Sequence, residues 1–197
     1  MADTASGTRD RLLAAALATF ARKGFEDTRV EDICQAAGSA RATFYRHFAG
    51  KDDVLVSLVE QLTAELDEMA VALAPVTGDA DGAAALRELI ARQLSIAERW
   101  SPVVEVISLP GGVASAARDR AIESVTAVSR TIGEALAAGG AGAGDPQTAA
   151  LGLTALTDGF GHQVRTWDLA LDRAAVVDSL TTVAFRMLHP EADLPAR

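Results

Sequence analysis

Apolar residues recur every three or four positions along most of the chain, the spacing that lines one face of an α-helix. The first such stretch follows Thr8, which can cap a helix, and stops before Gly24, which can end one. Residues 1–7 are small and polar, and they predict a disordered tail. The inward positions of the expected helix are Leu12, Leu13, Ala16, Leu17 and Phe20.

Two shorter periodic stretches follow, over residues 28–37 and 40–48, and Gly38 marks the turn between them. Thr28 stands three residues before Glu31, which is the form of a capping box at the start of a helix. Two short helices joined by a tight turn with a small residue are typical of a helix-turn-helix. The apolar positions expected to pack inward are Val30, Ile33, Cys34, Ala37, Phe44 and Phe48.

The rest of the chain continues the helical pattern. Strands with alternating apolar positions are scarce, so the fold is expected to be all-α with about nine helices. Pro102 is expected to open a short helix that ends near residues 110–112, and residues 76–82 and 139–145 are expected to be connections. The helices predicted after the helix-turn-helix cover residues 51–74, 83–100, 102–110, 114–138, 146–167 and 173–189.

Charge is distributed unevenly. The net charge is −9, yet residues 1–50 hold seven Lys and Arg against six Asp and Glu, and residues 51–197 hold eleven against twenty-one. The acidity therefore belongs to the C-terminal part, and it does not oppose nucleic-acid binding by the N-terminal part. A single cysteine fits a reducing cytoplasm, and no apolar run approaches the roughly 18 residues of a membrane span. We expect a cytoplasmic protein with no membrane partner.

The second helix of the motif offers a surface suited to duplex DNA. A short helix fits a major groove about 12 Å wide. Its outward side chains combine guanidinium, hydroxyl, phenol and imidazole groups, and none of them is acidic. These outward residues are Arg41, Ala42, Thr43, Tyr45, Arg46 and His47.

Several pieces of sequence, in order and at matching spacings, resemble the TetR family of regulators. The resemblance covers about residues 8–60, and it implies a DNA-binding domain at residues 1–50 and a ligand-binding and dimerisation domain at residues 51–197. The matching pieces are Phe20-Ala21-Arg22-Lys23-Gly24-Phe25, Thr28-Arg29-Val30-Glu31-Asp32-Ile33, Ala36-Ala37-Gly38, Thr43-Phe44-Tyr45-Arg46-His47-Phe48 and Lys51.

The resemblance also implies roles at DNA. Arg41 is the candidate for base readout, because an arginine can bond bidentately to guanine. Phosphate contacts are expected from Thr28, Tyr45, His47 and Lys51. Thr43 would touch a thymine methyl or a phosphate, and Ala42 would allow a close approach to the bases. The full set expected at DNA is Thr28, Ser39, Ala40, Arg41, Ala42, Thr43, Tyr45, His47 and Lys51.

The turn departs from the family pattern. Ser39-Ala40 stands where the family usually has Val-Ser. Either Ser39 caps the recognition helix one position early, or the cap is lost at a cost of about 1 kcal/mol.

The C-terminal helices hold candidates for two further sites. Large and polar side chains there predict an effector cavity, and the resemblance implies that the last two helices pair across a two-fold axis. The cavity candidates are Met69, Trp100, Phe160, Gln163 and Trp167. The dimer candidates are Ala149, Leu153, Leu156, Val176, Leu180, Val183 and Met187.

No catalytic, cofactor-binding or metal-binding motif is present in the sequence. The predicted function is that of a homodimeric repressor that binds a palindromic operator and is released by a small-molecule effector. The alternative is a helical small-molecule-binding or catalytic protein with a vestigial DNA-binding head.

Overall fold

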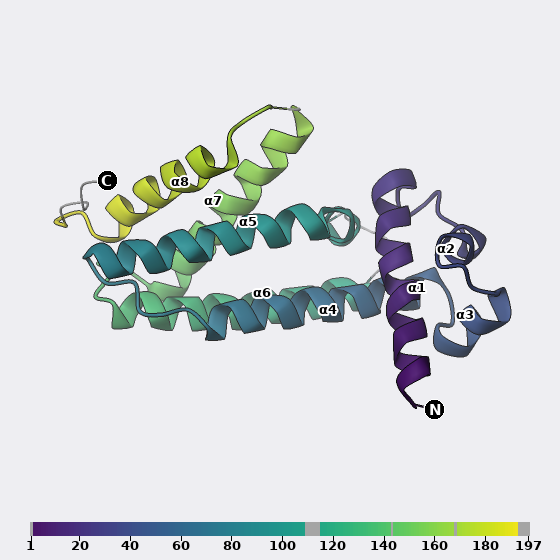
Figure 1. The fold of residues 1–197 in the computed structure, drawn as a ribbon. Helices are drawn as coiled ribbons and strands as arrows, with labels where there is room; N and C mark the ends of the chain where they lie inside the picture. The colour runs from purple at the N-terminus through teal and green to yellow at the C-terminus, as the bar shows by residue number, and fades with distance from the viewer. Residues whose placement is uncertain (1, 109–114, 143, 168, 193–197) are drawn as a thin grey trace. The chain divides into compact units, whose positions relative to one another are not determined.

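The computed structural model describes residues 2–108, 115–142, 144–167 and 169–192 (Figure 1). These residues contain eight α-helices and no strand, which confirms the predicted all-α class. The helices are α1 (Ala2–Lys23), α2 (Val30–Ala36), α3 (Arg41–His47), α4 (Lys51–Val71), α5 (Ala80–Ser108), α6 (Ser115–Ala138), α7 (Pro146–Thr166) and α8 (Arg173–Leu188).

The helix count of nine is wrong for the described residues, because Pro102 lies inside α5 and does not start a new helix. A proline within a helix removes one backbone hydrogen bond and tends to kink the helix. Here Trp100 and Val103 are buried on either side of it, 5% and 0% exposed, and their packing offsets that cost. The predicted end near residues 110–112 lies outside the described residues.

The N-terminal helix is longer than predicted. Where a disordered tail was expected over residues 1–7, α1 begins at Ala2. Extending an existing helix is inexpensive, because each added residue also gains a backbone hydrogen bond. The extension contains no proline, and its one glycine, Gly7, costs about 1 kcal/mol.

The chain divides into two compact units. The first comprises residues 1–63 and 99–123, and the second comprises residues 64–98 and 124–197. This division concerns packing alone. The predicted functional boundary after residue 50 stays a prediction.

Within the first unit, α1 packs against α2, and α2 packs against α3 (Figure 1). Aromatic side chains fill this small core: the Phe20 and Phe25 rings meet edge to face at 5.1 Å, and Phe44 and Phe48 lie 5.6 Å apart. Cys34 is also buried there, and desolvation raises the pKa of its thiol. The thiol therefore stays protonated and serves as a small apolar residue, as the sequence predicts.

Within the second unit, α8 buries one face and packs against α7. Asp172 caps α8 by accepting a hydrogen bond from the backbone N–H of Ala175 at 3.0 Å. The His189 ring lies 2.8 Å, by Nε2, from the carbonyl of Val76, which ties the end of α8 to the connection before α5. The buried face of α8 consists of Val177, Leu180, Thr181, Ala184, Phe185 and Leu188.

A buried polar cluster, which the sequence did not reveal, joins α5 to α7 in the second unit. Gln93, 3% exposed, donates to Thr154 and accepts from Thr157, each at 3.2 Å. Its amide is thereby satisfied on both sides, which removes the cost of burying it. Among the described residues, no helix combines the length and the apolar character that a bilayer crossing requires.

Candidate nucleic-acid interface

The turn between α2 and α3 has the geometry of a helix-turn-helix. Gly38 adopts a positive φ of 60°, a conformation that costs a side chain about 1–2 kcal/mol and that glycine adopts freely. The backbone N–H of Gly38 donates to Gln35 at 3.2 Å, and that of Ser39 donates to Cys34 at 2.9 Å. These two bonds form a Schellman motif, which ends α2 and directs the chain into α3.

The recognition helix begins without a side-chain cap. Ala40 occupies the N-cap position and offers no side-chain acceptor, and α3 starts at Arg41. Ser39 does not replace the cap, because no hydrogen bond links its hydroxyl to α3 in the described residues. Of the two alternatives at the turn, the lost cap is therefore the one that the structure contains.

The start of α2 differs from the prediction by one residue. The N-cap is Arg29, and its backbone N–H donates to the Asp32 carboxylate at 2.9 Å, so the capping box between Thr28 and Glu31 is wrong. Thr28 is 2% exposed and donates its hydroxyl to the carbonyl of Gly24 at 2.6 Å. The hydroxyl closes the preceding turn and is not directed at the helix.

Asp32 joins α2 to the end of α1. Lys23 Nζ lies 2.8 Å from its carboxylate. This hydrogen bond from Lys23, followed by the one from the Arg29 backbone, lowers the pKa of Asp32. The short helix α2 is therefore held at its N-terminus by an ionised carboxylate.

Four of the six residues of α3 that were expected to face outward are exposed, and the other two, Thr43 and His47, are half-buried. Arg41, Ala42, Tyr45 and Arg46 are exposed, whereas Phe44 is fully buried in the core. The face thus presents two guanidinium groups and a phenol around a small residue. Such a combination suits contacts with base edges and phosphates.

Arg41 is engaged by neighbours within the protein. Its guanidinium forms an ion pair with Glu31 of α2, and its Nη2 lies 3.5 Å from the Tyr45 hydroxyl. The hydrogen bond to Tyr45, followed by the charge of Glu31, raises the pKa of Arg41. The acidic neighbour comes from α2, and inspection of the recognition helix alone could not reveal it.

Two of the predicted phosphate contacts also have internal roles. Lys51 Nζ donates to the carbonyls of Phe25 and Glu26 at 2.8 and 3.0 Å and lies 4.5 Å from the centre of the Phe25 ring. His47 is half-buried, and its Nε2 is buried without a hydrogen-bond partner in the described structure. Thr43 is half-buried as well.

Arg9 is a residue that the sequence analysis missed. From α1 its Nη2 donates to Ser57 at 2.9 Å, and its guanidinium lies 5.2 Å from the centre of the Phe48 ring. It thereby links α1, α4 and the end of α3. Only the packing of three helices creates this contact, so no local signal marks it.

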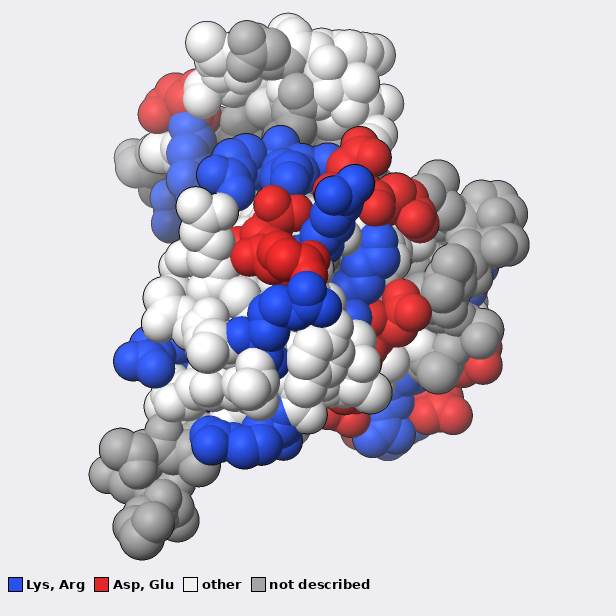
Figure 2. Space-filling model, turned by 90° about the vertical axis from the view of Figure 1, so that its right-hand side faces the viewer, with Lys and Arg blue, Asp and Glu red and all other residues white. Residues whose placement is uncertain are grey.

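The charge on this side of the molecule is mixed. Figure 2 shows Lys and Arg side chains in separate groups with Asp and Glu between them. Within the first unit, Arg41 is paired with Glu31 and Lys23 with Asp32. The basic groups are thus partly neutralised by neighbours while no DNA is bound.

The effector-cavity candidates fall in both compact units. Trp100 belongs to the first unit, and the other four belong to the second. Met69 is buried and Phe160 is half-buried. Gln163 and Trp167 are exposed, the latter by 64%, so neither lines an enclosed cavity in its own unit. Helical spacing could not reveal that Trp167 lies beyond the last residue of α7.

The dimer candidates fall into two groups. Leu153 and Leu180 are buried in the core of their own unit, 5% and 7% exposed, and are not available to a partner. Val183 and Met187 are 49% and 69% exposed. Ala149, Leu156 and Val176 are half-buried. Both faces of these helices carry apolar residues, so the sequence could not distinguish the inner from the outer one.

Comparison with known proteins agrees with this geometry. Residues 12–58 match the family model of bacterial regulatory proteins of the tetR family. The uncharacterised HTH-type transcriptional regulator YvdT of Bacillus subtilis is 32% identical over 100 residues, which are 50% of each chain. The HTH-type transcriptional repressor NicS of Pseudomonas putida is 34% identical over 90 residues, 46% of this chain and 42% of that one.

The chain thus aligns with about half the length of these curated relatives. A solved structure extends the likeness of fold over nearly the whole chain. The transcriptional regulator FadR from Bacillus subtilis, in complex with stearoyl-CoA, superposes with a TM-score of 0.71 at 20% identity, covering 91% of this chain and 98% of that one.

The geometry of α2, the Gly38 turn and α3 defines a helix-turn-helix protein. Over residues 12–58, which include this helix-turn-helix, the chain is similar to the tetR family of bacterial regulatory proteins.

Proposed function

We propose that this protein is a homodimeric transcriptional repressor that inserts α3 into the major groove of a palindromic operator and dissociates when a small molecule binds its C-terminal domain. The observation that carries the proposal is the exposed face of α3, where Arg41, Tyr45 and Arg46 surround Ala42 immediately after the turn. We assign it a regulatory role without catalysis, in the cytoplasm, where its operator would be found.

Base readout by Arg41 requires an exchange of partners. In the free protein its guanidinium pairs with Glu31, and both side chains are more than half exposed. Such exposed pairs contribute about 0.2–1 kcal/mol, whereas a bidentate contact with guanine contributes about 1–3 kcal/mol. Guanine can therefore displace Glu31 from Arg41. A base that offers one acceptor forms a weaker contact, which little more than replaces the lost ion pair.

Phosphate contacts are assigned to Tyr45, His47 and Lys51. Two donors of Lys51 are engaged by carbonyls, which leaves its third N–H for a phosphate and fixes the direction of the ammonium. The imidazole of His47 would have to rotate to bring Nε2 out of the protein. The hydroxyl and backbone N–H of Thr28 donate to Gly24 and Phe25. We therefore assign Thr28 to the support of the loop.

The proposed dimer uses the outer faces of α7 and α8. Val183, Met187 and Leu151 are exposed there, by 49%, 69% and 42%. A methyl group added at Gly152 or Gly159 would meet nothing within 4 Å in the protomer, so a partner helix could approach closely at both. A two-fold axis would place the two recognition helices about 34–36 Å apart, in successive major grooves.

Release by an effector is proposed from the family and fold. NicS is named a repressor, and the FadR structure contains stearoyl-CoA. An effector of this protein would have to bind more tightly to a dimer whose recognition helices no longer match the groove spacing.

Selection of bound duplexes from a random pool by the full-length protein tests the proposal. We expect enrichment of a palindrome whose half-site centres are about 10 base pairs apart, or a multiple of this. Enrichment of no sequence, with no duplex retained at low salt, would overturn it. That outcome would favour a helical protein that binds or converts a small molecule and carries a vestigial head.

A further inference from the structure

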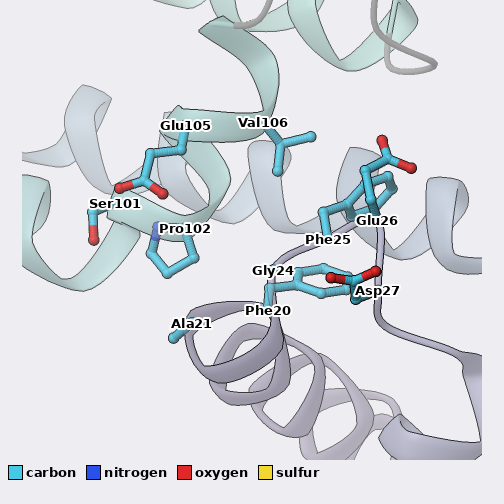
Figure 3. A pocket seen from close by; sticks show the side chains of 10 residues that line it. All are labelled: Phe20, Ala21, Gly24, Phe25, Glu26, Asp27, Ser101, Pro102, Glu105 and Val106. Atoms are coloured by element: carbon cyan, nitrogen blue, oxygen red, sulfur yellow. The ribbon is translucent and has the colours of Figure 1, made fainter.

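A cavity of about 330 Å³ opens within the first unit, next to the end of α1 (Figure 3). One wall is formed by Phe20 of α1 and by the loop of residues 24–27. The facing wall is one turn of α5, residues 101–106. The volume lies at the small end of the range of ligand pockets, about 300–1,000 Å³, and suits a molecule with one ring.

The lining combines aromatic surface with negative charge. Phe20, Phe25 and Pro102 supply apolar surface, and Glu26, Asp27 and Glu105 supply carboxylates from both walls. The close-up shows Glu105 on one wall and Glu26 and Asp27 on the other (Figure 3). No lysine or arginine is among the residues that line the cavity.

The three carboxylates form no ion pair with any residue that the structure describes. Carboxylates on facing walls repel one another, and a cation between them relieves that repulsion. The Phe25 ring already lies 4.5 Å from the Lys51 ammonium, and Phe20 is 2% exposed, so the rings and Pro102 can only border the apolar body of such a cation. An anion would be repelled by the carboxylates.

We propose that this cavity is a binding site for a small organic cation, an amine or quaternary ammonium attached to an aromatic or alkyl body. None of the five residues predicted to line the effector cavity is among the residues that line this cavity. Its ammonium would lie between Glu105 and the carboxylates of the loop, and its apolar body would lie against Phe20 and Pro102.

The site is connected to the candidate DNA contacts through the loop. The carbonyls of Phe25 and Glu26 accept hydrogen bonds from Lys51, the proposed phosphate contact. Thr28, directly after the loop, fixes the approach to α2 through its bond to Gly24. A cation that draws Glu26 and Asp27 toward Glu105 would therefore change the position of Lys51. This regulatory part of the proposal rests on the proposed function, whereas cation binding does not.

The test of binding is a calorimetric titration of the full-length protein with benzyltrimethylammonium and, separately, with 3-phenylpropionate. We expect the cation to bind and the anion not to bind. Glu105→Gln should weaken cation binding by about three- to tenfold, because it removes one charge and keeps the shape. The matched control is Glu60→Gln, which changes an exposed glutamate of the same unit outside the cavity and should leave the affinity unchanged.

A second variant tests the place of binding by shape. Ala21 lines the cavity and is exposed, so Ala21→Leu should narrow the cavity and abolish binding without disturbing the core. Equal binding of the cation and the anion would overturn the site. Equal affinities of the Glu105→Gln and Glu60→Gln variants would overturn it too.

The regulatory part is tested by measuring operator affinity with and without saturating benzyltrimethylammonium. We expect a change of at least about threefold in wild type that is lost in Glu105→Gln. If the operator affinity were unchanged with the cation bound, the coupling to DNA binding would be overturned, whereas the proposal of a cation-binding site would stand. Failure to bind any duplex would overturn the proposed function, and the titrations would still decide the site.

Discussion

The carboxylate of Glu31 on α2 is paired with the guanidinium of Arg41 on α3. The residue best placed to read a base is therefore held by an acid of the preceding helix while no DNA is bound. A DNA contact with Arg41 has to replace the contact with Glu31, and a guanine edge replaces it more fully than a lone phosphate oxygen does.

Replacement of Glu31 by glutamine should release Arg41. We expect Glu31→Gln to increase affinity for the operator by up to about fivefold, the equivalent of one exposed ion pair, with a smaller gain for random duplex, because a lone phosphate replaces the pair only in part. Fluorescence anisotropy with both duplexes measures the two affinities. Glu134→Gln, which breaks the exposed pair with Arg130 on α6, serves as the control. An unchanged ratio of the two affinities would contradict this role of Glu31.

Lys51 should affect stability and salt dependence together. Lys51→Met keeps most of the aliphatic stem but removes the bonds to the carbonyls of Phe25 and Glu26, so the free energy of unfolding should fall by about 1–2 kcal/mol. The slope of log affinity against log salt should become shallower by about one, since one phosphate contact is lost. Denaturant titration and anisotropy at several salt concentrations measure the two effects. If the variant were destabilised but kept the wild-type salt slope, Lys51 would support the loop of residues 24–27 without contacting a phosphate.

The missing cap at Ala40 can be restored. The backbone of Ala40 has the extended conformation of an N-cap, with φ −75° and ψ 149°. Ala40→Ser should therefore raise the free energy of unfolding by about 0.5–2 kcal/mol, because its hydroxyl can accept a bond from the first turn of α3. Ala42→Ser, inside the same helix, provides the comparison and should not stabilise. Equal unfolding free energies for Ala40→Ser and wild type would show that a hydroxyl at this position does not cap α3.

Asp32 should make stability depend on acid pH. The bond from Lys23 and the bond from the Arg29 backbone lower its pKa below the ordinary value of 3.8. A carboxyl whose pKa is lower in the folded state stabilises the protein above the unfolded pKa, and this contribution is lost as the pH falls through the folded pKa. Wild type should therefore melt at a higher temperature than Asp32→Asn near neutral pH, and the difference should shrink below 3.8. A constant difference across that window would contradict this assignment.

The sequence predicts best those features that depend on neighbours along the chain. Periodicity and Gly38 located α2, the turn and α3, and the buried Phe44 and exposed Tyr45 lie where helical spacing places them. The sequence Ser39-Ala40 predicted a lost cap as one of two alternatives, and the structure contains that one.

Features that depend on contacts between helices could not be predicted in this way. The partner of Arg41 comes from another helix, and Arg9 acquires its role only when α1 lies against Phe48. Thr28 was misassigned because a hydroxyl can bond to the preceding turn as well as to the following helix. Likewise, Leu180 and Val183 are both apolar residues of α8, and only packing shows which of them faces the core.

In the proposed complex, α3 reads duplex DNA through Arg41. The most direct test is the affinity of Arg41→Ala for the selected palindrome and for the same duplex changed at single positions, measured by anisotropy. Arg130→Ala, an exposed arginine of the second unit, is the control. We expect Arg41→Ala to lose about 1–3 kcal/mol of specific binding and to tolerate changes at one base position in each half-site. Unchanged affinity and unchanged base preference would contradict the claim.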